Sequence, residues 1–361
     1  MQKLQHYLKT HPLALLLLCL PLALLAEYGH WGSLWVFLLS AVGVIPMAEY
    51  IGESTEALAA YTSPRVGGLL NATLGNAAEL IITIVAIREG LLELVKASIT
   101  GSILGNLLLV LGMAFLLGGL KNGLQTFEQR NATRNAILLV LAVLALLIPS
   151  VLSHAIGPEG SPQVETLSLG VAGVMIVLYA LALIYGFRAQ GMPLAHQPSD
   201  GDVVHEPDWS IRKAVLVLAA STIGVVVLSE LLVGAVEAVV AGFGVSEFFL
   251  GVILIPVVGN VAEHLVAVEV ALANKMELSV EIAIASSLQI ALFVAPVLVF
   301  ISLAMGNPLQ LIFNQFELLA LIAGVLVVAL VSADGESNWL EGAELLAVYI
   351  ILGLAFFLLP G

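Results

Sequence analysis

The sequence predicts an all-α membrane protein with about eleven transmembrane helices, arranged as one N-terminal helix and two inverted five-helix repeats. Three observations carry this prediction. The 361 residues are 60% hydrophobic and only 11% charged, which is far from the composition of a soluble domain. Eleven apolar segments are long enough to cross a bilayer as helices. Two of these segments share a motif, GNAAE at residues 75–79 and GNVAE at 259–263.

The apolar segments follow one another with mostly short polar connections. Lys3 and Lys9 precede the first segment, so a cleaved signal peptide is the alternative to a first span. The segment lacks a clean A-x-A cleavage site, which favours the span. The predicted spans are 13–28, 33–58, 66–87, 95–118, 135–153, 166–187, 212–234, 246–272, 278–304, 315–332 and 341–359.

A polar stretch between the sixth and seventh spans divides the chain. It reads GMPLAHQPSDGDVVHEPDWS over residues 191–210, and its acids suit either a solvated connector or a cation-sensing element. The predicted organisation is therefore an N-terminal helix at 1–30, a first repeat at 31–190, an acidic cytoplasmic linker at 191–211 and a second, inverted repeat at 212–361.

The basic residues predict the orientation. With the N-terminus in the cytoplasm, only Arg88 and Lys96 fall outside, which is a strong positive-inside bias. Eleven spans then place the C-terminus outside, and the short loops suggest a prokaryotic plasma membrane. The residues placed inside are Lys3, Lys9, Arg65, Lys121, Arg130, Arg134, Arg188, Arg212, Lys213 and Lys275.

The two halves share polar residues at matching spacings. Each repeat contains five helices, and this odd number inverts the second copy in the membrane. Inverted repeats are typical of secondary transporters, whose binding site lies near the midplane where interrupted helices meet. The matched pairs are Asn76 with Asn260, Glu79 with Glu263, Ser102 with Ser286, Glu49 with Glu230 and Glu56 with Glu237.

The motif glutamates lie in the middle of predicted spans. A charged side chain there costs about 2.5 to 3.5 kcal/mol on insertion scales. A salt bridge is the ordinary compensation, yet residues 214–274 contain five glutamates and neither Lys nor Arg. We therefore expect protons or metal cations to neutralise these acids, with helices around a water-filled pore as the alternative.

The residues beside the motif glutamates favour a hard cation. Asn76 and Glu79 share one helix face, as do Asn260 and Glu263. The motif glycines permit local unwinding, and Pro256 frees a backbone carbonyl. Ca2+ takes about six to eight oxygen ligands in flexible geometry, whereas Mg2+ requires a tighter octahedron. Soft and nitrogen ligands, which zinc and copper prefer, are scarce in a chain with one cysteine.

His264 follows Glu263 directly. Neighbouring helical residues point about 100 degrees apart, so we expect His264 to support the Glu263 region by hydrogen bonding rather than to share its ion. The chain lacks an H-E-x-x-H pattern, which removes the simplest metalloprotease interpretation. We expect no enzymatic reaction and no cofactor.

Polar residues on the next span of each repeat are expected to line or support the ion pathway. Serine is also an ordinary helix-packing residue in membranes, whereas buried Asn and Gln are more costly. The expected pathway residues are Ser102, Asn106, Ser286, Ser287 and Gln289.

Further glutamates form an acidic stripe. Glu49, Glu53 and Glu56 follow a helical spacing and are partly mirrored by Glu230 and Glu237. We interpret these residues as a cation-attracting vestibule, and a solvated helix face is the alternative.

At these residues the sequence resembles the calcium/proton exchangers, a branch of the calcium:cation antiporter superfamily. The resemblance rests on the two GN-x-x-E motifs, the histidine in GNVAEH, and the segments SITGSILGNLLLVLG and SSLQIALFV. Sodium/calcium exchangers are associated instead with GTS-x-PE-like motifs. The resemblance implies alternating access, assembly into homo-oligomers, and Glu79 and Glu263 as the central cation carboxylates.

The predicted function is secondary active Ca2+/H+ antiport at a midplane site formed by Glu79 and Glu263. The expected partners are Ca2+ and protons as substrates and the lipid bilayer, without nucleic acid. A sodium-coupled Ca2+ exchanger is the alternative of the same class. A cation channel is the alternative of another class, although inverted halves with two focal acids argue against a ring of acids around a pore.

Overall fold

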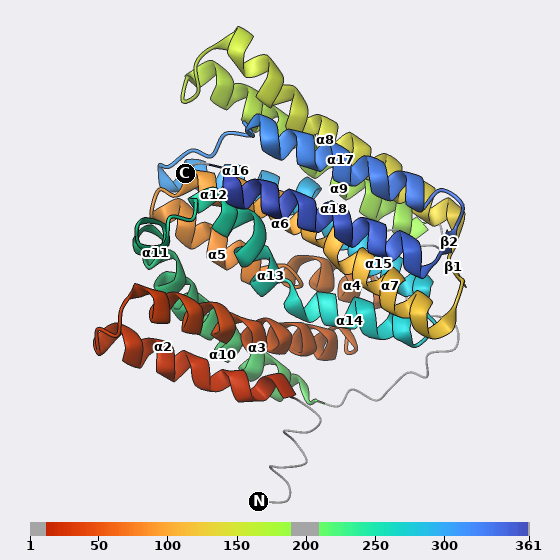
Figure 1. Ribbon diagram of the computed structural model, residues 1–361, viewed down its shortest axis with the longest axis horizontal. Helices are drawn as coiled ribbons and strands as arrows, with labels where there is room; N and C mark the ends of the chain where they lie inside the picture. Colours follow the sequence, from red (N-terminus) through yellow and green to blue (C-terminus); the bar gives the residue numbers. More distant parts are fainter. Residues whose placement is uncertain (1–11, 189–208, 360–361) are drawn as a thin grey trace, which may run out of the picture.

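The computed structural model describes residues 12–188 and 209–359, which form a bundle of helices (Figure 1). Within these ranges the strands are limited to one antiparallel pair, β1 (Gln125–Thr126) and β2 (Glu336–Ser337). The prediction of an all-α protein is therefore confirmed. The linker predicted at 191–211 lies almost wholly outside the described residues.

The predicted spans coincide with helices or with consecutive runs of helices. The first half contains η1 (Pro12–Leu18), α2 (Cys19–Tyr28), α3 (Ser33–Ala59), α4 (Pro64–Leu74), α5 (Ala77–Arg88), α6 (Leu92–Leu104), η2 (Gly105–Val110), α7 (Leu111–Asn122), α8 (Gln129–Ile156) and α9 (Pro162–Arg188). The second half contains α10 (Ile211–Gly234), α11 (Val236–Phe243), α12 (Glu247–Phe249), η3 (Leu250–Leu254), α13 (Ile255–Gly259), α14 (Val261–Leu272), α15 (Met276–Gln289), η4 (Ile290–Val294), α16 (Ala295–Met305), α17 (Gln315–Val331) and α18 (Trp339–Leu358).

Seven helical segments in the described part are long and apolar enough to cross a membrane. The bent pair Glu247–Gly259 and Glu263–Leu272, whose halves meet at 61°, forms an eighth span if it is counted as one. The shorter apolar helices Leu13–Tyr28 and Gln315–Val331 and the interrupted pair α4–α5 account for the other predicted spans. The protein is therefore an integral, multi-pass membrane protein.

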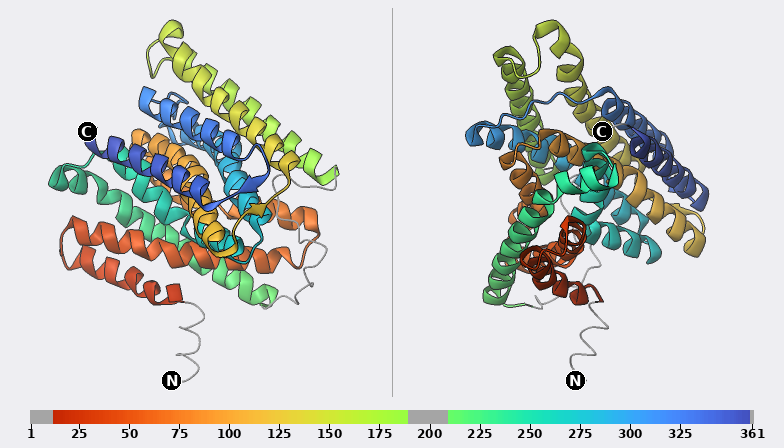
Figure 2. Two further views of the ribbon diagram at one scale, coloured as in Figure 1. Left: turned by 45° about the vertical axis from the view of Figure 1, so that its right-hand side comes forward. Right: turned by 60° about the vertical axis from the view of Figure 1, so that its left-hand side comes forward.

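The first helices of the two repeats, α3 and α10, pack against each other in opposite directions. The Tyr61 hydroxyl, just after α3, donates a hydrogen bond to the carbonyl oxygen of Trp209, just before α10, at 3.0 Å. The end of one helix thus lies beside the start of the other, as an inverted repeat requires. The helices α2, α3 and α10 occupy one side of the bundle, and α8 and α9 occupy the opposite side (Figures 1 and 2).

Both GN-x-x-E motifs interrupt a helix at the same position. The break between α4 and α5 falls at Asn76, with φ −97° and ψ 21°. The break between α13 and α14 falls at Asn260, with φ −104° and ψ 6°. The matching backbone angles show that the two copies of the motif adopt one local structure in opposite halves of the protein.

The helices that follow each motif contain a π-helical turn. The turn η2 begins three residues after Ser102, and η4 begins four residues after Ser286. A π-helical turn shifts the helix register and often marks a functional site. The paired serines therefore lie at corresponding places, just before a change in helix register.

Candidate cation site

The two interrupted helices meet at the motif glycines. A Cβ atom added to Gly75 would lie 3.3 Å from Oε1 of Glu263, and one added to Gly259 would lie 3.1 Å from Cγ of Glu79. Each motif glutamate therefore lies against the glycine of the other motif. This reciprocal contact explains the glycines, because a larger residue would push the opposite glutamate away.

The motif asparagines begin a helix but do not cap it. Neither Asn76 nor Asn260 accepts a hydrogen bond from the helix backbone through its side chain. Asn314 and Asn338 also precede a glutamate by three residues, but their backbones are extended and they form reciprocal capping boxes. An extended backbone lets an N-cap side chain reach back to the helix. The motif side chains are therefore left available for another partner.

The side-chain nitrogens of the motif asparagines have partners. Asn76 Nδ2 donates to Oε1 of Gln289 at 2.8 Å. Asn260 Nδ2 donates to the Ser102 hydroxyl at 3.3 Å and to the Pro256 carbonyl at 3.1 Å. These bonds orient each amide so that its oxygen is left for a different contact.

Four oxygens of the motifs are buried without a donor. Both carboxylate oxygens of Glu79 and the Oδ1 atoms of Asn76 and Asn260 receive no hydrogen bond from the described residues. The Asn260 side chain lies close enough to interact with the Glu79 carboxylate, although no donor there meets hydrogen-bonding geometry. Buried polar atoms are nearly always paired in native proteins. Such a group of unpaired acceptors is suited to a cation or to protons.

Glu263 has a different environment from Glu79. Its Oε2 accepts a hydrogen bond from Ser286 at 2.6 Å, and Ser286 in turn accepts one from Asn106 Nδ2 at 2.9 Å. Glu79 is 3% exposed, whereas Glu263 is partly exposed. The site is therefore more accessible at Glu263 than at Glu79.

Two other expected pathway residues, His264 and Ser287, differ in their connection to the site. His264 Nε2 lies 3.2 Å from Oδ1 of Asn106, which connects it to Glu263 only through Asn106 and Ser286. Ser287 donates to the carbonyl oxygens of Ala283 at 3.0 Å and Ile103 at 3.5 Å. These bonds place the Ser287 hydroxyl in helix packing.

The acidic stripe on α3 and its partial copy in the second repeat lie at opposite ends of the bundle, because α3 and α10 are antiparallel. Glu49 and Glu53 are half-buried, and Glu56 is exposed. Glu49 and Glu53 also interact with neighbouring groups. The five expected vestibule residues therefore do not form one surface.

The acids of residues 214–274 were expected to lack a basic partner, and for Glu230 this expectation was wrong. Its Oε1 lies 3.0 Å from Nη1 of Arg88, in an ion pair whose side chains are both about half exposed. Arg88 ends α5, in the other repeat, so a search for bases within the same segment missed it. Glu237, on α11, is exposed.

Sequence reasoning also missed a buried acid and a buried base. Glu317 is 1% exposed and accepts hydrogen bonds from the Asn314 amide at 2.8 Å and the Thr100 hydroxyl at 3.3 Å. Lys96 is 5% exposed and pairs with Glu93 at 2.5 Å and Glu159 at 3.3 Å. The N-x-x-E spacing before an apolar run was the signal for the Glu317 capping box.

Among the described residues, no group of three or more His, Cys, Asp or Glu side chains is arranged to hold a metal. The candidate cation site instead combines two carboxylates with two amide oxygens. Inverted halves whose broken helices bring two acidic motifs together define a secondary ion transporter.

Comparison with known proteins agrees with this class. The chain belongs to the sodium/calcium exchanger protein family, whose model matches residues 32–188 and 213–358, and within it to the calcium/proton exchangers.

Three relatives illustrate this membership. A Ca2+/H+ antiporter of Aphanothece halophytica is 45% identical over 357 residues, which cover 96% of each chain. The Ca2+/H+ antiporter ChaA of Bacillus subtilis is 45% identical over 341 residues, covering 94% of this chain and 96% of that one. A crystal structure of the Ca2+/H+ antiporter protein YfkE is 42% identical, has a TM-score of 0.82, and matches 96% of this chain and 98% of the other.

Proposed function

We propose that this protein is a secondary active antiporter that exchanges Ca2+ for protons at a site formed by Glu79 and Glu263. The observation that carries the proposal is the group of buried, unpaired oxygens on Glu79, Asn76 and Asn260. The names of the relatives, which are Ca2+/H+ antiporters, support the same assignment.

The chemistry of this group suits Ca2+. Two carboxylates balance the charge of a divalent cation, and the amide oxygens of Asn76 and Asn260 add neutral ligands. Ca2+ takes about six to eight oxygens in flexible geometry, so water supplies the remaining ligands. Because Glu263 is partly exposed, water and the ion reach the site from its side.

Coupling follows from competition for the same oxygens. Without a cation, burial favours the neutral, protonated form of a carboxylic acid. Bound Ca2+ favours the charged form and releases the proton. One site therefore carries either Ca2+ or protons, and alternating access moves them in opposite directions.

The neighbouring residues hold the site in shape. Asn106 and Ser286 orient the Glu263 carboxylate, and His264 holds the Asn106 amide. Gln289 and Ser102 orient the motif asparagines. Ser287 contributes helix packing rather than an ion contact.

We further propose that the protein lies in a prokaryotic plasma membrane with its N-terminus in the cytoplasm and its C-terminus outside. In this orientation the α3 acids Glu49, Glu53 and Glu56 lie toward the cytoplasmic end and attract cations there. Glu230 and Glu237 lie toward the outer end. Copies of the chain assemble into a homo-oligomer, as the family resemblance implies.

Ca2+ binding to the purified protein tests the assignment of the site. Glu79→Gln and Glu263→Gln each remove one charge while nearly preserving volume, so each should weaken Ca2+ binding on the order of a hundredfold in a calorimetric titration. Glu341→Gln is the matched control, because Glu341 belongs to the capping box of α18. It should cost about 1 kcal/mol of stability or less and leave Ca2+ affinity unchanged.

Wild-type affinity in either motif variant would exclude a paired site. If both motif variants bind Ca2+ normally but fail to transport it, these glutamates act in the conformational change rather than in binding. Displacement of bound Ca2+ by Na+ but not by protons would instead favour the sodium-coupled exchanger.

A further inference from the structure

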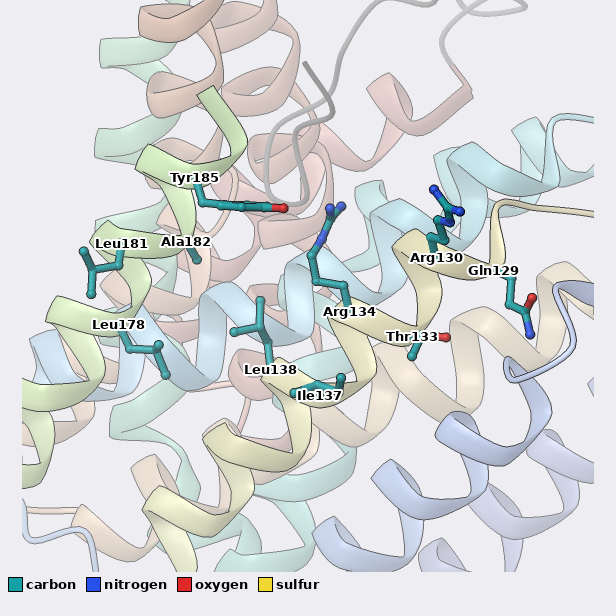
Figure 3. Close-up of a pocket in the computed structure, with 10 residues that line it drawn as sticks. All are labelled: Gln129, Arg130, Thr133, Arg134, Ile137, Leu138, Leu178, Leu181, Ala182 and Tyr185. Atoms are coloured by element: carbon teal, nitrogen blue, oxygen red, sulfur yellow. The ribbon is translucent and has the colours of Figure 1, made fainter. Parts of the chain in front are cut away.

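A groove of about 560 Å³ lies between α8 and α9 (Figure 3). These two helices lie on the side of the bundle away from α3 and α10 (Figure 1). Five of the ten residues that line the groove are aliphatic: Ile137, Leu138, Leu178, Leu181 and Ala182. Ile137 and Leu181 are each 57% exposed. In a membrane-spanning helix pair, such exposed aliphatic side chains face hydrocarbon.

The two arginines of the groove lie at one end of it. Arg130 and Arg134 come from the first turns of α8, directly before the apolar segment 135–153. Figure 3 shows their guanidinium groups at the same end as Tyr185, with Ile137 and Leu138 farther along the groove. Arginine and tyrosine are typical of the boundary between hydrocarbon and water.

The positive charge of these arginines is not neutralised by a salt bridge. Within residues 12–188 and 209–359, neither Arg130 nor Arg134 has an acidic group within 4.0 Å of it. Arg134 Nη2 donates to Oδ1 of Asn131 at 2.6 Å, and its guanidinium lies 5.8 Å from the centre of the Tyr185 ring. Its Nε is buried without a hydrogen-bond acceptor in the described part of the chain.

The position of the arginines at the N-terminus of α8 adds to the positive charge at this end of the groove. The N-terminus of a helix carries a partial positive charge, which disfavours cations there. Glu281 on α15 acts on Arg134 through space but makes no ion pair with it. Two arginines at such a place, in a chain of net charge −14, fit a negatively charged partner.

We propose that the groove binds an anionic phospholipid. The phosphate of its headgroup contacts Arg130 and Arg134, and one acyl chain lies along the aliphatic side chains of α8 and α9. Basic pockets between transmembrane helices are suited to lipid headgroups, and a guanidinium matches the geometry of a phosphate.

The lining of the groove distinguishes this occupant from others. Free phosphate makes no use of the aliphatic groove. The 191–211 linker carries acids but lacks a run of apolar residues long enough to fill it. A phospholipid supplies both the charge and the hydrocarbon in one molecule.

Native mass spectrometry of the intact protein tests the proposal. The purified protein is exchanged into mixed micelles containing equal amounts of phosphatidylglycerol and phosphatidylcholine of the same acyl chains. The native chain should retain phosphatidylglycerol in preference to phosphatidylcholine. The Arg130→Gln/Arg134→Gln variant should lose roughly tenfold or more of this preference, and Ile137→Trp/Leu181→Trp should lose retention of the lipid because the new rings fill the groove.

The matched control is Lys121→Gln/Arg212→Gln, which also removes two exposed charges from the predicted cytoplasmic face, outside the groove. It should keep the native preference. Equal retention of both lipids by the native chain, or an equal loss in the control, would overturn the proposal. Phosphatidylglycerol binding that appears only after Asp200, Asp202, Glu206 and Asp208 are changed to their amides would assign the groove to the linker and also overturn it.

Discussion

The two GN-x-x-E motifs place chemically identical glutamates in different surroundings. Glu79 is buried and has no hydrogen-bond donor among the described residues, whereas Glu263 accepts a hydrogen bond from Ser286. The repeat in the sequence was sufficient to predict the pairing of the motifs and the oxygens they present. It could not predict the Arg88–Glu230 ion pair or the backbone contacts of Ser287, because both depend on how separate helices pack.

The contact between Gly259 and Glu79 leads to a prediction at the scale of one residue. A Cβ atom at Gly259 would lie 3.1 Å from Cγ of Glu79, so Gly259→Ala should displace the carboxylate by a few tenths of an ångström and weaken Ca2+ binding roughly tenfold. Gly52→Ala is the control, because a Cβ there meets no atom within 4 Å. If both variants bind Ca2+ equally well, Gly259 is not needed to position the Glu79 carboxylate.

At the scale of the element, the interrupted and π-helical segments decide the geometry of the site. Apolar segment length and the GN-x-x-E motifs predicted the spans and located the place of interruption. The π-helical turns η2, η3 and η4 were not predicted, because one extra residue in a turn barely alters an apolar segment. Their positions depend on close contact between helices rather than on local sequence preference.

The close contact between α6 and η3 gives a prediction about stability. A Cβ atom at Gly101 would lie 2.0 Å from the carbonyl oxygen of Val252, so the two backbones must separate in Gly101→Ala. We expect this variant to lose about 1 to 3 kcal/mol of stability, measured as a lower midpoint of thermal unfolding in detergent. Gly170→Ala, where the added Cβ meets no atom within 4 Å, should keep or raise the midpoint. An unchanged midpoint in Gly101→Ala would show that α6 and η3 are not held at this distance.

At the scale of the whole molecule, the inverted arrangement separates the acids of the two repeats. The odd number of spans in each repeat predicted this inversion, and the antiparallel contact of α3 with α10 agrees with it. The alignment of the two repeats paired Glu230 and Glu237 with acids of α3. Because the second repeat is inverted, Glu230 and Glu237 lie at the other end of the bundle. The inversion predicted from the number of spans therefore implies that the two acidic regions lie apart, although the matched spacings alone do not.

The exposed end of the α3 stripe leads to a prediction about the attraction of ions. Glu56→Gln removes one exposed negative charge, and we expect it to raise the Ca2+ concentration needed for half-maximal transport by roughly twofold at low salt, with little change in maximal rate. The effect should disappear at about 1 M salt, where the screening length falls to about 3 Å. Equal half-maximal concentrations for the variant and the wild type at low salt would identify the stripe as a solvated helix face.

The central claim is that protons and Ca2+ compete for one site, and uphill transport tests it most directly. Sealed proteoliposomes are loaded with acidic buffer, the voltage is clamped with a potassium ionophore, sodium is excluded, and external Ca2+ is offered at alkaline pH. We predict that Ca2+ accumulates above electrochemical equilibrium, that a protonophore collapses the accumulation, and that Glu263→Gln abolishes it while Glu341→Gln does not. Ca2+ flux that follows only its own gradient at every pH difference, or uphill transport that requires a sodium gradient, would contradict the account.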